Sequence, residues 1–260
     1  MSGNPEGETV RCEVLDDGAI WHVVLATPKA NIVDMDKAEQ LASIFGRAAE
    51  DKGLKAVLIE GEGPNFSFGA SVPEHLPGRF EKMIPGFHQL FRRIIESSVI
   101  TLAAVRGQCL GGGLELVSFC NRIFASPDAK LGQPEIMLGV FPPVASVVLP
   151  ERVGRGAAEH LCLSGKSVSA EEALRIGLVD QLDDDPTAAA LGYARKFLLP
   201  KSASSLRLGV RAVRTGWNER FLAELDRVES LYMKDLMSTT DAVEGLTAFV
   251  EKREAAWSNR

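Results

Sequence analysis

The sequence contains few cysteines and fewer basic than acidic residues. Its 260 residues include four cysteines, and none of them has the Cys-x-x-Cys spacing that is typical of a zinc site. We therefore expect reduced thiols, a cytoplasmic location and no metal centre. The net charge of −6 and the pI of about 5.4 argue against non-specific binding to nucleic acid.

Long hydrophobic runs are also missing from this sequence. The first nine residues are polar, which excludes a signal peptide there and predicts a loose tail. No apolar run approaches the roughly 18 residues that a membrane helix requires. The chain has 45% hydrophobic residues instead, enough for the core of one large domain or of one domain with an appendage.

The hydrophobic pattern predicts a mixed α/β core. Two strands are expected at 10–15 and 20–25, joined as a hairpin at Asp16-Asp17-Gly18. Further strands are expected at 56–60, 99–105 and 122–125. Helical spacing predicts helices at 35–49, capped by Asp34, at 80–96, 114–119 and 155–163, and a short one after Ser169, which forms a capping box with Glu172.

The best candidate for a domain boundary is the acidic stretch Asp183-Asp184-Asp185-Pro186. Beyond it, the pattern is helical throughout, at about 187–199, 203–216, 218–236 and 240–256. The sequence therefore predicts two parts. Residues 1–185 form an α/β core that holds the functional site, and residues 186–260 form a helical region.

The segment 99–117 carries the most informative motif. An apolar strand is followed by Gly107 and then by the triple glycine Gly111-Gly112-Gly113, behind which a helix begins. Glycines at the start of a helix expose backbone N–H groups and let another molecule approach the main chain. Glu115 follows at once, and a carboxylate beside a bound carbonyl is a candidate acid or base.

Two other motifs accompany this segment. A Gly69-Ala70 turn follows an earlier strand, and Gly132-Gln133-Pro134-Glu135 places a second carboxylate twenty residues after Glu115. With these motifs, the chain resembles the crotonase (enoyl-CoA hydratase/isomerase) superfamily over almost its whole length. The segment from Phe66 to Ala70 matches the family's Phe-x-x-Gly-Ala turn.

The resemblance implies a fold, a site and an assembly. The fold would be a ββα spiral core with a C-terminal helical trimerisation region, and the assembly a homo-hexamer built from two trimers. The N–H groups of Ala70 and Gly112 would form an oxyanion hole, and Glu115 and Glu135 would be the two catalytic carboxylates. Contacts to the substrate and its CoA would come from Lys29, Phe68, Gly69, Gly111, Phe249 and Lys252. No metal is implied, and no cofactor other than the coenzyme A of the substrate itself.

Three stretches, 66–77, 106–110 and 139–142, resemble a branch of the family that hydrates cyclic dienoyl-CoA thioesters in anaerobic benzoyl-CoA degradation. This resemblance implies a hydro-lyase that converts cyclohexa-1,5-diene-1-carbonyl-CoA to 6-hydroxycyclohex-1-ene-1-carbonyl-CoA. Ser71 and Pro73 stand where ordinary enoyl-CoA hydratases have aspartate and lysine, and Pro142-Pro143-Val144-Ala145-Ser146 replaces their Pro-Gly-x-Gly-Gly. Pro143 has no N–H to donate, and these changes predict a pocket reshaped for a ring.

Other functions are possible on the sequence alone. A dinucleotide-binding oxidoreductase would need a Gly-x-Gly-x-x-Gly motif, which the spacing from Gly107 to Gly113 does not fit. A non-catalytic acyl-CoA-binding homologue, a straight-chain enoyl-CoA hydratase and a ring-opening hydrolase are closer alternatives. The histidines lack the spacing of metal ligands, and we expect packing or surface positions for His22, His75, His88 and His160. His75 is also a candidate for lining the pocket, because it follows the Ala70 turn.

Overall fold

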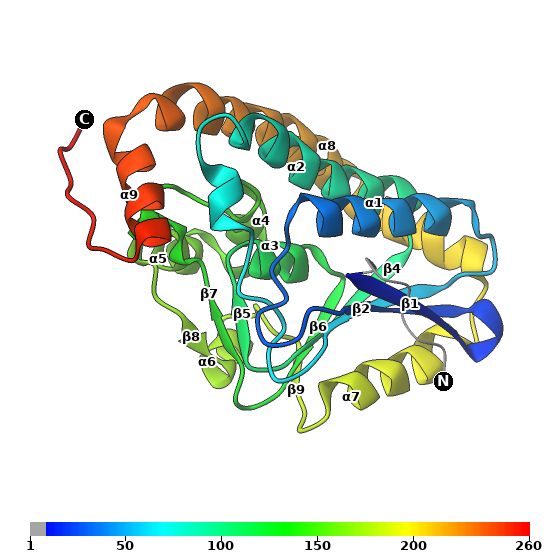
Figure 1. Cartoon of the computed structure of the whole chain (residues 1–260). Helices are drawn as coiled ribbons and strands as arrows, with labels where there is room; N and C mark the ends of the chain where they lie inside the picture. The colour runs from blue at the N-terminus through cyan, green and yellow to red at the C-terminus, as the bar shows by residue number, and fades with distance from the viewer. Residues whose placement is uncertain (1–8) are drawn as a thin grey trace.

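The computed structural model describes residues 9–260, so all of the predicted tail except Thr9 lies outside the described residues. Figure 1 shows a spiral in which helices cover a twisted sheet on both faces. Among the helices of residues 9–260, none is long and apolar enough to cross a membrane.

The larger sheet has six strands in the order β1-β2-β3-β4-β6-β9. β1 pairs with β2 antiparallel, and all the other neighbours are parallel. Val57 and Ile59 of β3 face one side of the sheet, and Leu58 faces the other; all three are buried. Burial on both faces explains why the central strands β3 and β4 are nearly continuous apolar runs. The bounds are β1 Val10–Leu15, β2 Ile20–Leu25, β3 Ala56–Gly61, β4 Ile100–Val105, β6 Arg122–Ala125 and β9 Gln181–Leu182.

A smaller sheet consists of β5 (Gln108–Leu110), β7 (Lys130–Gly132) and β8 (Val168–Ser169). The chain passes from a strand of the larger sheet to a strand of the smaller one and then into a helix, as in β4-β5-α3. This arrangement confirms the predicted α/β class and the ββα spiral. The expectation that the strand at 99–105 leads directly into the glycine turn is wrong, because β5 lies between them.

The helices of the core include one that the sequence did not predict. α4 begins at Pro143, where proline is favoured because the first helical N–H has no intrahelical partner. Two predicted caps are confirmed: Asp34 accepts from Lys37 N at 2.9 Å, and Ser169 accepts from Glu172 N at 3.3 Å. The bounds are α1 Met35–Glu50, η2 Val72–His75, α2 Phe80–Ser97, α3 Gly112–Phe119, η3 Pro134–Leu138, α4 Pro143–Val153, α5 Arg155–Ser164 and α6 Ala170–Arg175.

The C-terminal region is helical, as predicted, but its divisions differ. The expected break near residue 217 is wrong, because Trp217 lies inside one long helix and packs on Phe119 and Phe221 with ring centroids 5.1 and 5.4 Å apart. The last helix ends at Glu251 rather than near 256, because Lys252 adopts a left-handed conformation. The bounds are α7 Pro186–Tyr193, continued by Ala194–Leu198, α8 Ala203–Ser230, continued by Leu231–Asp235 and Leu236–Ser238, and α9 Thr240–Glu251.

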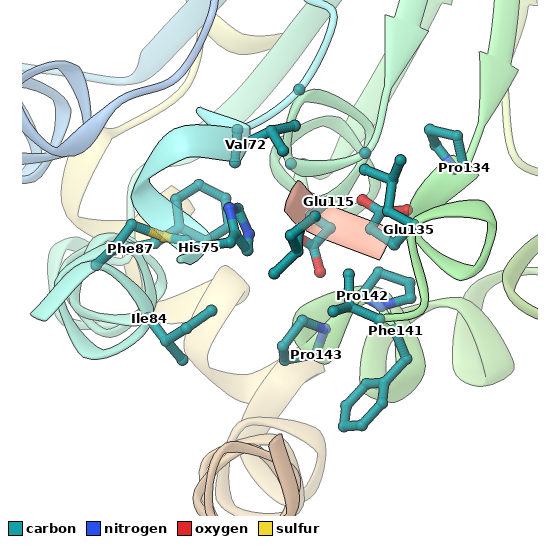
Figure 2. Close-up of a pocket in the computed structure, with 18 of the residues that line it drawn as sticks. Val72, His75, Ile84, Phe87, Glu115, Pro134, Glu135, Phe141, Pro142 and Pro143 are labelled. Atoms are coloured by element: carbon teal, nitrogen blue, oxygen red, sulfur yellow. The ribbon is translucent and has the colours of Figure 1, made fainter. Parts of the chain in front are cut away.

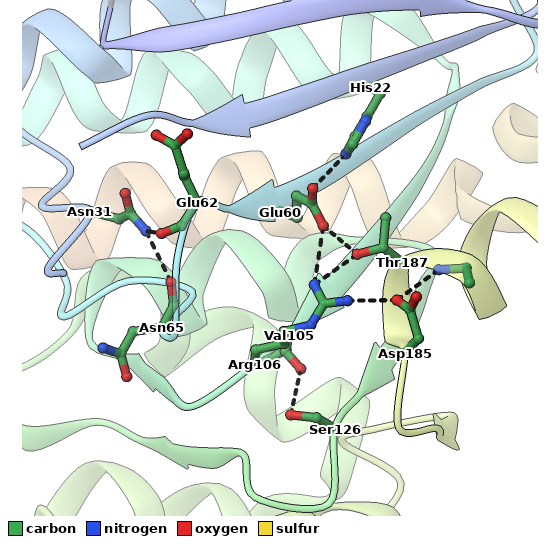
Figure 3. Close-up of polar contacts among 11 residues, drawn as sticks. His22, Asn31, Glu60, Glu62, Asn65, Val105, Arg106, Ser126, Asp185 and Thr187 are labelled. Atoms are coloured by element: carbon green, nitrogen blue, oxygen red, sulfur yellow. Dashed lines mark hydrogen bonds and ion pairs between the residues drawn. The ribbon is translucent and has the colours of Figure 1, made fainter. Parts of the chain in front are cut away.

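A polar network attaches the start of α7 to the larger sheet (Figure 3). Arg106 donates to Glu60 at 3.3 Å, to Thr187 at 2.9 Å and to Asp185 at 2.6 Å. Glu60 also contacts His22 at 2.9 Å. α7 then covers the second face of the sheet. The boundary predicted at 185/186 stays a prediction, and the structure places strong contacts across it.

Candidate active site

An inner cavity lies where the two sheets meet α2, α3 and α4. Its lining is mostly apolar, with two carboxylates and two imidazoles among the polar groups. Figure 2 shows Glu115 near the centre of this cavity, with Phe87 and Ile84 on one side and Glu135 on the other. The lining residues are Phe68, Gly69, Ala70, Val72, His75, Met83, Ile84, Phe87, His88, Gly111, Gly112, Glu115, Pro134, Glu135, Leu138, Val140, Phe141, Pro142, Pro143 and Leu246.

The predicted amide donors lie next to each other at one edge of the cavity. A Cβ added to Gly112 would lie 3.2 Å from Ala70 N, so glycine keeps the space in front of that amide open. Gly112 is the first residue of α3, and its N–H therefore has no intrahelical acceptor. The carbonyl of Gly69 accepts from Val33 N at 2.9 Å. Because C=O and N–H point in opposite directions across a trans peptide, this bond turns Ala70 N–H the other way.

Glu115 is buried, with only 4% of its surface exposed. Its Oε1 accepts a hydrogen bond of 2.9 Å from Ala145 N, in the first turn of α4. Burial raises the pKa of Glu115 to about 7, while the backbone amides of Ala145 and Val144 partly oppose this rise. Because Pro143 has no N–H, the amides of the next two residues, Val144 and Ala145, hold this carboxylate.

Glu135 lies in η3 and approaches the glycine turn. A Cβ on Gly111 would come within 2.5 Å of Glu135 Oε1, so only glycine allows this approach. Burial and the neighbouring Glu115 charge raise the pKa of Glu135 well above its ordinary range. Gln133 is fully buried, and with its amide nitrogen toward Glu135 it donates to both carboxylate oxygens at 3.1 and 3.2 Å. The two carboxylates therefore favour a state in which at least one of them is protonated.

Two histidines line the inner cavity: His75, which was a candidate for this place, and His88, for which we expected only a packing or surface position. His75 Nδ1 lies 2.9 Å from the Ser71 carbonyl oxygen, and burial lowers the pKa of His75, so this nitrogen carries the single proton. His88 is fully buried, and its Nδ1 lies 2.6 Å from Glu229 of α8. The position of His75 five residues after Ala70 was the one available sign in the sequence, whereas nothing there connects His88 with Glu229.

An outer groove of about 660 Å³ continues from the inner cavity, with which it shares Phe68, Ala70, Val72, Pro134 and Leu138. This volume lies in the range of ligand pockets. Phe68 and Phe249 are 44% and 55% exposed, and both line the groove. Phe249 belongs to α9 of the same chain. Lys29 and Lys252 are exposed and do not line the groove in the described part of the chain, so their predicted roles stay predictions.

The residues 9–260 contain no group of three or more histidine, cysteine, aspartate or glutamate side chains placed to hold a metal ion. The four cysteines are free thiols, and three of them are buried. The expectation that the protein uses neither a metal nor a separate cofactor remains a prediction.

Comparison with known proteins gives a consistent result. Residues 16–260 match the family model described as enoyl-CoA hydratase/isomerase. A Thauera aromatica protein named cyclohexa-1,5-dienecarbonyl-CoA hydratase is 51% identical over 244 residues, which cover 94% of this chain and 95% of that protein. A probable enoyl-CoA hydratase of Bacillus subtilis is 34% identical, covering 89% and 92%.

Solved structures agree with this result. The crystal structure of an enoyl-CoA hydratase/isomerase from Pseudoalteromonas atlantica superimposes with a TM-score of 0.86 at 25% identity. The superposition covers 96% of this chain and 100% of the other.

Proposed function

The chain belongs to the enoyl-CoA hydratase/isomerase family, and from this premise we propose that it is a hydro-lyase acting on a cyclic conjugated dienoyl-CoA. The reaction would convert cyclohexa-1,5-diene-1-carbonyl-CoA to 6-hydroxycyclohex-1-ene-1-carbonyl-CoA. One observation carries the proposal: two carboxylates with raised pKa values face one apolar cavity beside two adjacent backbone amides. The cyclic substrate is supported by the name of the Thauera aromatica relative, cyclohexa-1,5-dienecarbonyl-CoA hydratase.

The amides of Ala70 and Gly112 would bind the thioester oxygen. Addition of water to an unsaturated thioester places negative charge on this oxygen, and two preorganised N–H donors stabilise that charge more than the neutral carbonyl. The apolar cavity strengthens these hydrogen bonds because it excludes water.

Glu115 and Glu135 would move the protons. One carboxylate accepts a proton from water while the water oxygen bonds to the β-carbon, and electrons shift through the conjugated system onto the thioester oxygen. The protonated carboxylate then returns a proton to the carbon at the far end of the diene, which leaves a double bond conjugated with the thioester. One water is consumed, and the pair again shares its proton.

The outer groove would hold the CoA portion of the substrate. Phe68 and Phe249 present exposed rings on its walls, while Gly69 and Gly111 bring the main chain close to the thioester. Lys29 and Lys252 would meet the phosphates of CoA from outside the groove.

The C-terminal region would also assemble the protein, as a homo-hexamer built from two trimers. Two apolar side chains on α8 support this proposal, since Leu208 is 61% and Val213 87% exposed. Light scattering after gel filtration measures the mass of the particle, and the mass of a single chain at micromolar concentration would contradict the assembly.

A straight-chain enoyl-CoA hydratase is the second candidate, favoured by the similarity to the Bacillus subtilis protein named probable enoyl-CoA hydratase. Pro143 lines the cavity and favours a ring instead, because it adds rigid bulk where the glycine of ordinary enoyl-CoA hydratases would leave open space.

The test is to incubate the protein with the cyclic dienoyl-CoA and with crotonyl-CoA, and to follow each by mass spectrometry. We expect the mass of one water to be gained with the cyclic substrate, and turnover of crotonyl-CoA to be far slower. Equal rates would favour the second candidate. Binding of both thioesters without turnover would indicate a non-catalytic homologue.

A further inference from the structure

Ser67 lies behind the Ala70 amide and is fully buried. Its Oγ donates to the Asn31 carbonyl oxygen at 2.8 Å and accepts from Gly69 N at 3.0 Å. One hydroxyl thus joins the 27–33 loop to the peptide immediately before the one that carries the Ala70 N–H.

The loop on the other side of this bond is itself fixed. Asn31 is fully buried, and its side-chain amide donates to the carbonyl oxygens of Glu62 and Asn65 at 3.0 and 2.9 Å. Lys37, also buried, donates to Thr27 Oγ1 at 2.6 Å and to the Ile32 carbonyl at 2.8 Å. The loop carries Val33, whose N–H holds the Gly69 carbonyl at 2.9 Å. Ser67 therefore bonds to a rigid support.

The segment that carries the second amide, that of Gly112, also contacts Ser67. The Ser67 carbonyl accepts from Leu110 N at 2.9 Å, at the end of β5 and just before the glycine turn. Gly113 in the first turn of α3 is also close, because a Cβ added there would lie 2.7 Å from Ser67 Cβ. Ser67 thus contacts the segments that carry both Ala70 and Gly112.

We propose that Ser67 is a positioning residue for the oxyanion hole, acting through its Oγ bonds to Asn31 and Gly69. The inference rests on the proposed function, since it assumes that a thioester oxygen lies between the two amides. Without the hydroxyl, Gly69 N–H loses its buried acceptor, and the following peptide is free to turn. A misplacement of about 1 Å at a reacting group lowers turnover by roughly a hundredfold.

Ser97 provides a matched control. It is 2% exposed, its Oγ donates to the Ile94 carbonyl at 2.8 Å, and it accepts from Val99 N, also two residues ahead, at 3.3 Å. It lies at the C-terminal end of α2, outside the lining of the inner cavity. Ser67→Ala and Ser97→Ala therefore each remove one donated and one accepted hydrogen bond from a buried serine.

The experiment uses cyclohexanecarbonyl-CoA with a ¹³C-labelled carbonyl, a saturated ring thioester that cannot be hydrated. Infrared difference spectra of the bound ligand report how strongly the carbonyl is polarised. We expect wild type and Ser97→Ala to lower the carbonyl frequency equally, and Ser67→Ala to lower it less. With the cyclic diene, Ser67→Ala should lose roughly ten- to a hundredfold in kcat with little change in the Kd of the saturated ligand, and Ser67→Cys should lie between.

Two results would separate the possible failures. Equal carbonyl shifts and equal kcat in Ser67→Ala and Ser97→Ala would overturn the role of Ser67 while leaving the proposed function intact. If wild type does not bind or polarise the labelled thioester, the proposed function itself fails. Melting temperatures identify any general loss of structure, which should affect both alanine variants alike.

Discussion

Glu115 Oε1 accepts a hydrogen bond of 2.9 Å from Ala145 N, which places a buried carboxylate at the positive end of α4. The bond favours the ionised form, yet burial has the larger effect and raises the pKa to about 7. A helix terminus offsets about 1 kcal/mol of such a penalty, and the desolvation of a carboxylate exceeds this. The Glu115 carboxyl group therefore keeps its proton at pH values at which an exposed glutamate would be ionised.

This proton makes stability depend on pH. Between about pH 4.5 and about pH 7 the folded state binds more protons than the unfolded state, so the free energy of unfolding falls as pH rises, by roughly 3 kcal/mol in all. Above pH 7 this contribution stays lost. We expect Glu115→Gln to reduce the slope in urea unfolding at pH 5, 6, 7 and 8, while the part of the slope that comes from the raised pKa of Glu135 remains. Glu39→Gln, at an exposed site on α1, should keep it; equal slopes in both variants would contradict the assignment.

The carboxylate pair predicts a catalytic effect of each glutamate. Glu115→Gln and Glu135→Gln keep the shape of the side chain but cannot carry a proton between water and carbon. We expect each to lower kcat on the cyclic diene by orders of magnitude with a modest change in KM. Steady-state kinetics measures both constants. Near wild-type turnover in either variant would remove that residue from the mechanism.

The space in front of the Ala70 amide predicts a steric effect. A Cβ at Gly112 would lie 3.2 Å from Ala70 N and 3.3 Å from the Phe87 ring, in the position that the thioester oxygen needs. We expect Gly112→Ala to lower kcat by about a hundred- to a thousandfold, as loss of one oxyanion donor does. Gly46→Ala, in α1 with open space around the new methyl group, is the control and should retain full activity. Full activity in Gly112→Ala would show that the oxygen binds elsewhere.

Two polar contacts join α2 to α8, and their burial predicts different contributions to stability. His88 and Glu229 pair at 2.6 Å with the imidazole buried, whereas Arg92 and Asp226 pair at 2.5 Å with the aspartate 64% exposed. Glu229→Ala leaves a buried donor without its partner and should lower the free energy of unfolding by about 1–3 kcal/mol. Asp226→Ala should lower it by less than about 1 kcal/mol. Urea unfolding midpoints compare the two, and equal losses would be the contrary result.

The sequence predicted those elements whose ends are marked by turn or polar residues. The strands at 10–15, 20–25 and 122–125 have the predicted bounds, because Asp16-Asp17-Gly18 separates the first two and the polar residues Asn121 and Ser126 flank the third. β5 has only three residues, too few to show a period. α4 was missed because Pro142-Pro143 resembles a loop, whereas proline also begins helices.

Sequence patterns could not predict contacts between segments that are far apart along the chain. Glu115 and Glu135 were identified from a motif, but the bond from Ala145 depends on α4, which no pattern indicated. The Ser67–Asn31 bond spans 36 positions, and neither residue type signals it. His75 had one signal in the sequence, its position five residues after Ala70, and the 3-10 turn η2 places it in the cavity.

The outer groove takes its walls from both ends of the chain, with Ala30 and Ile32 on one side and Phe249 of α9 on another. A ligand seated there joins these segments thermodynamically, since it binds only when both are folded. The stabilisation by the bound ligand, RT ln(1 + [L]/Kd), then adds to the free energy that protects each of the two segments against hydrogen exchange. Loosening of either terminus would release the ligand, and the ligand in turn would make the molecule unfold as one cooperative unit.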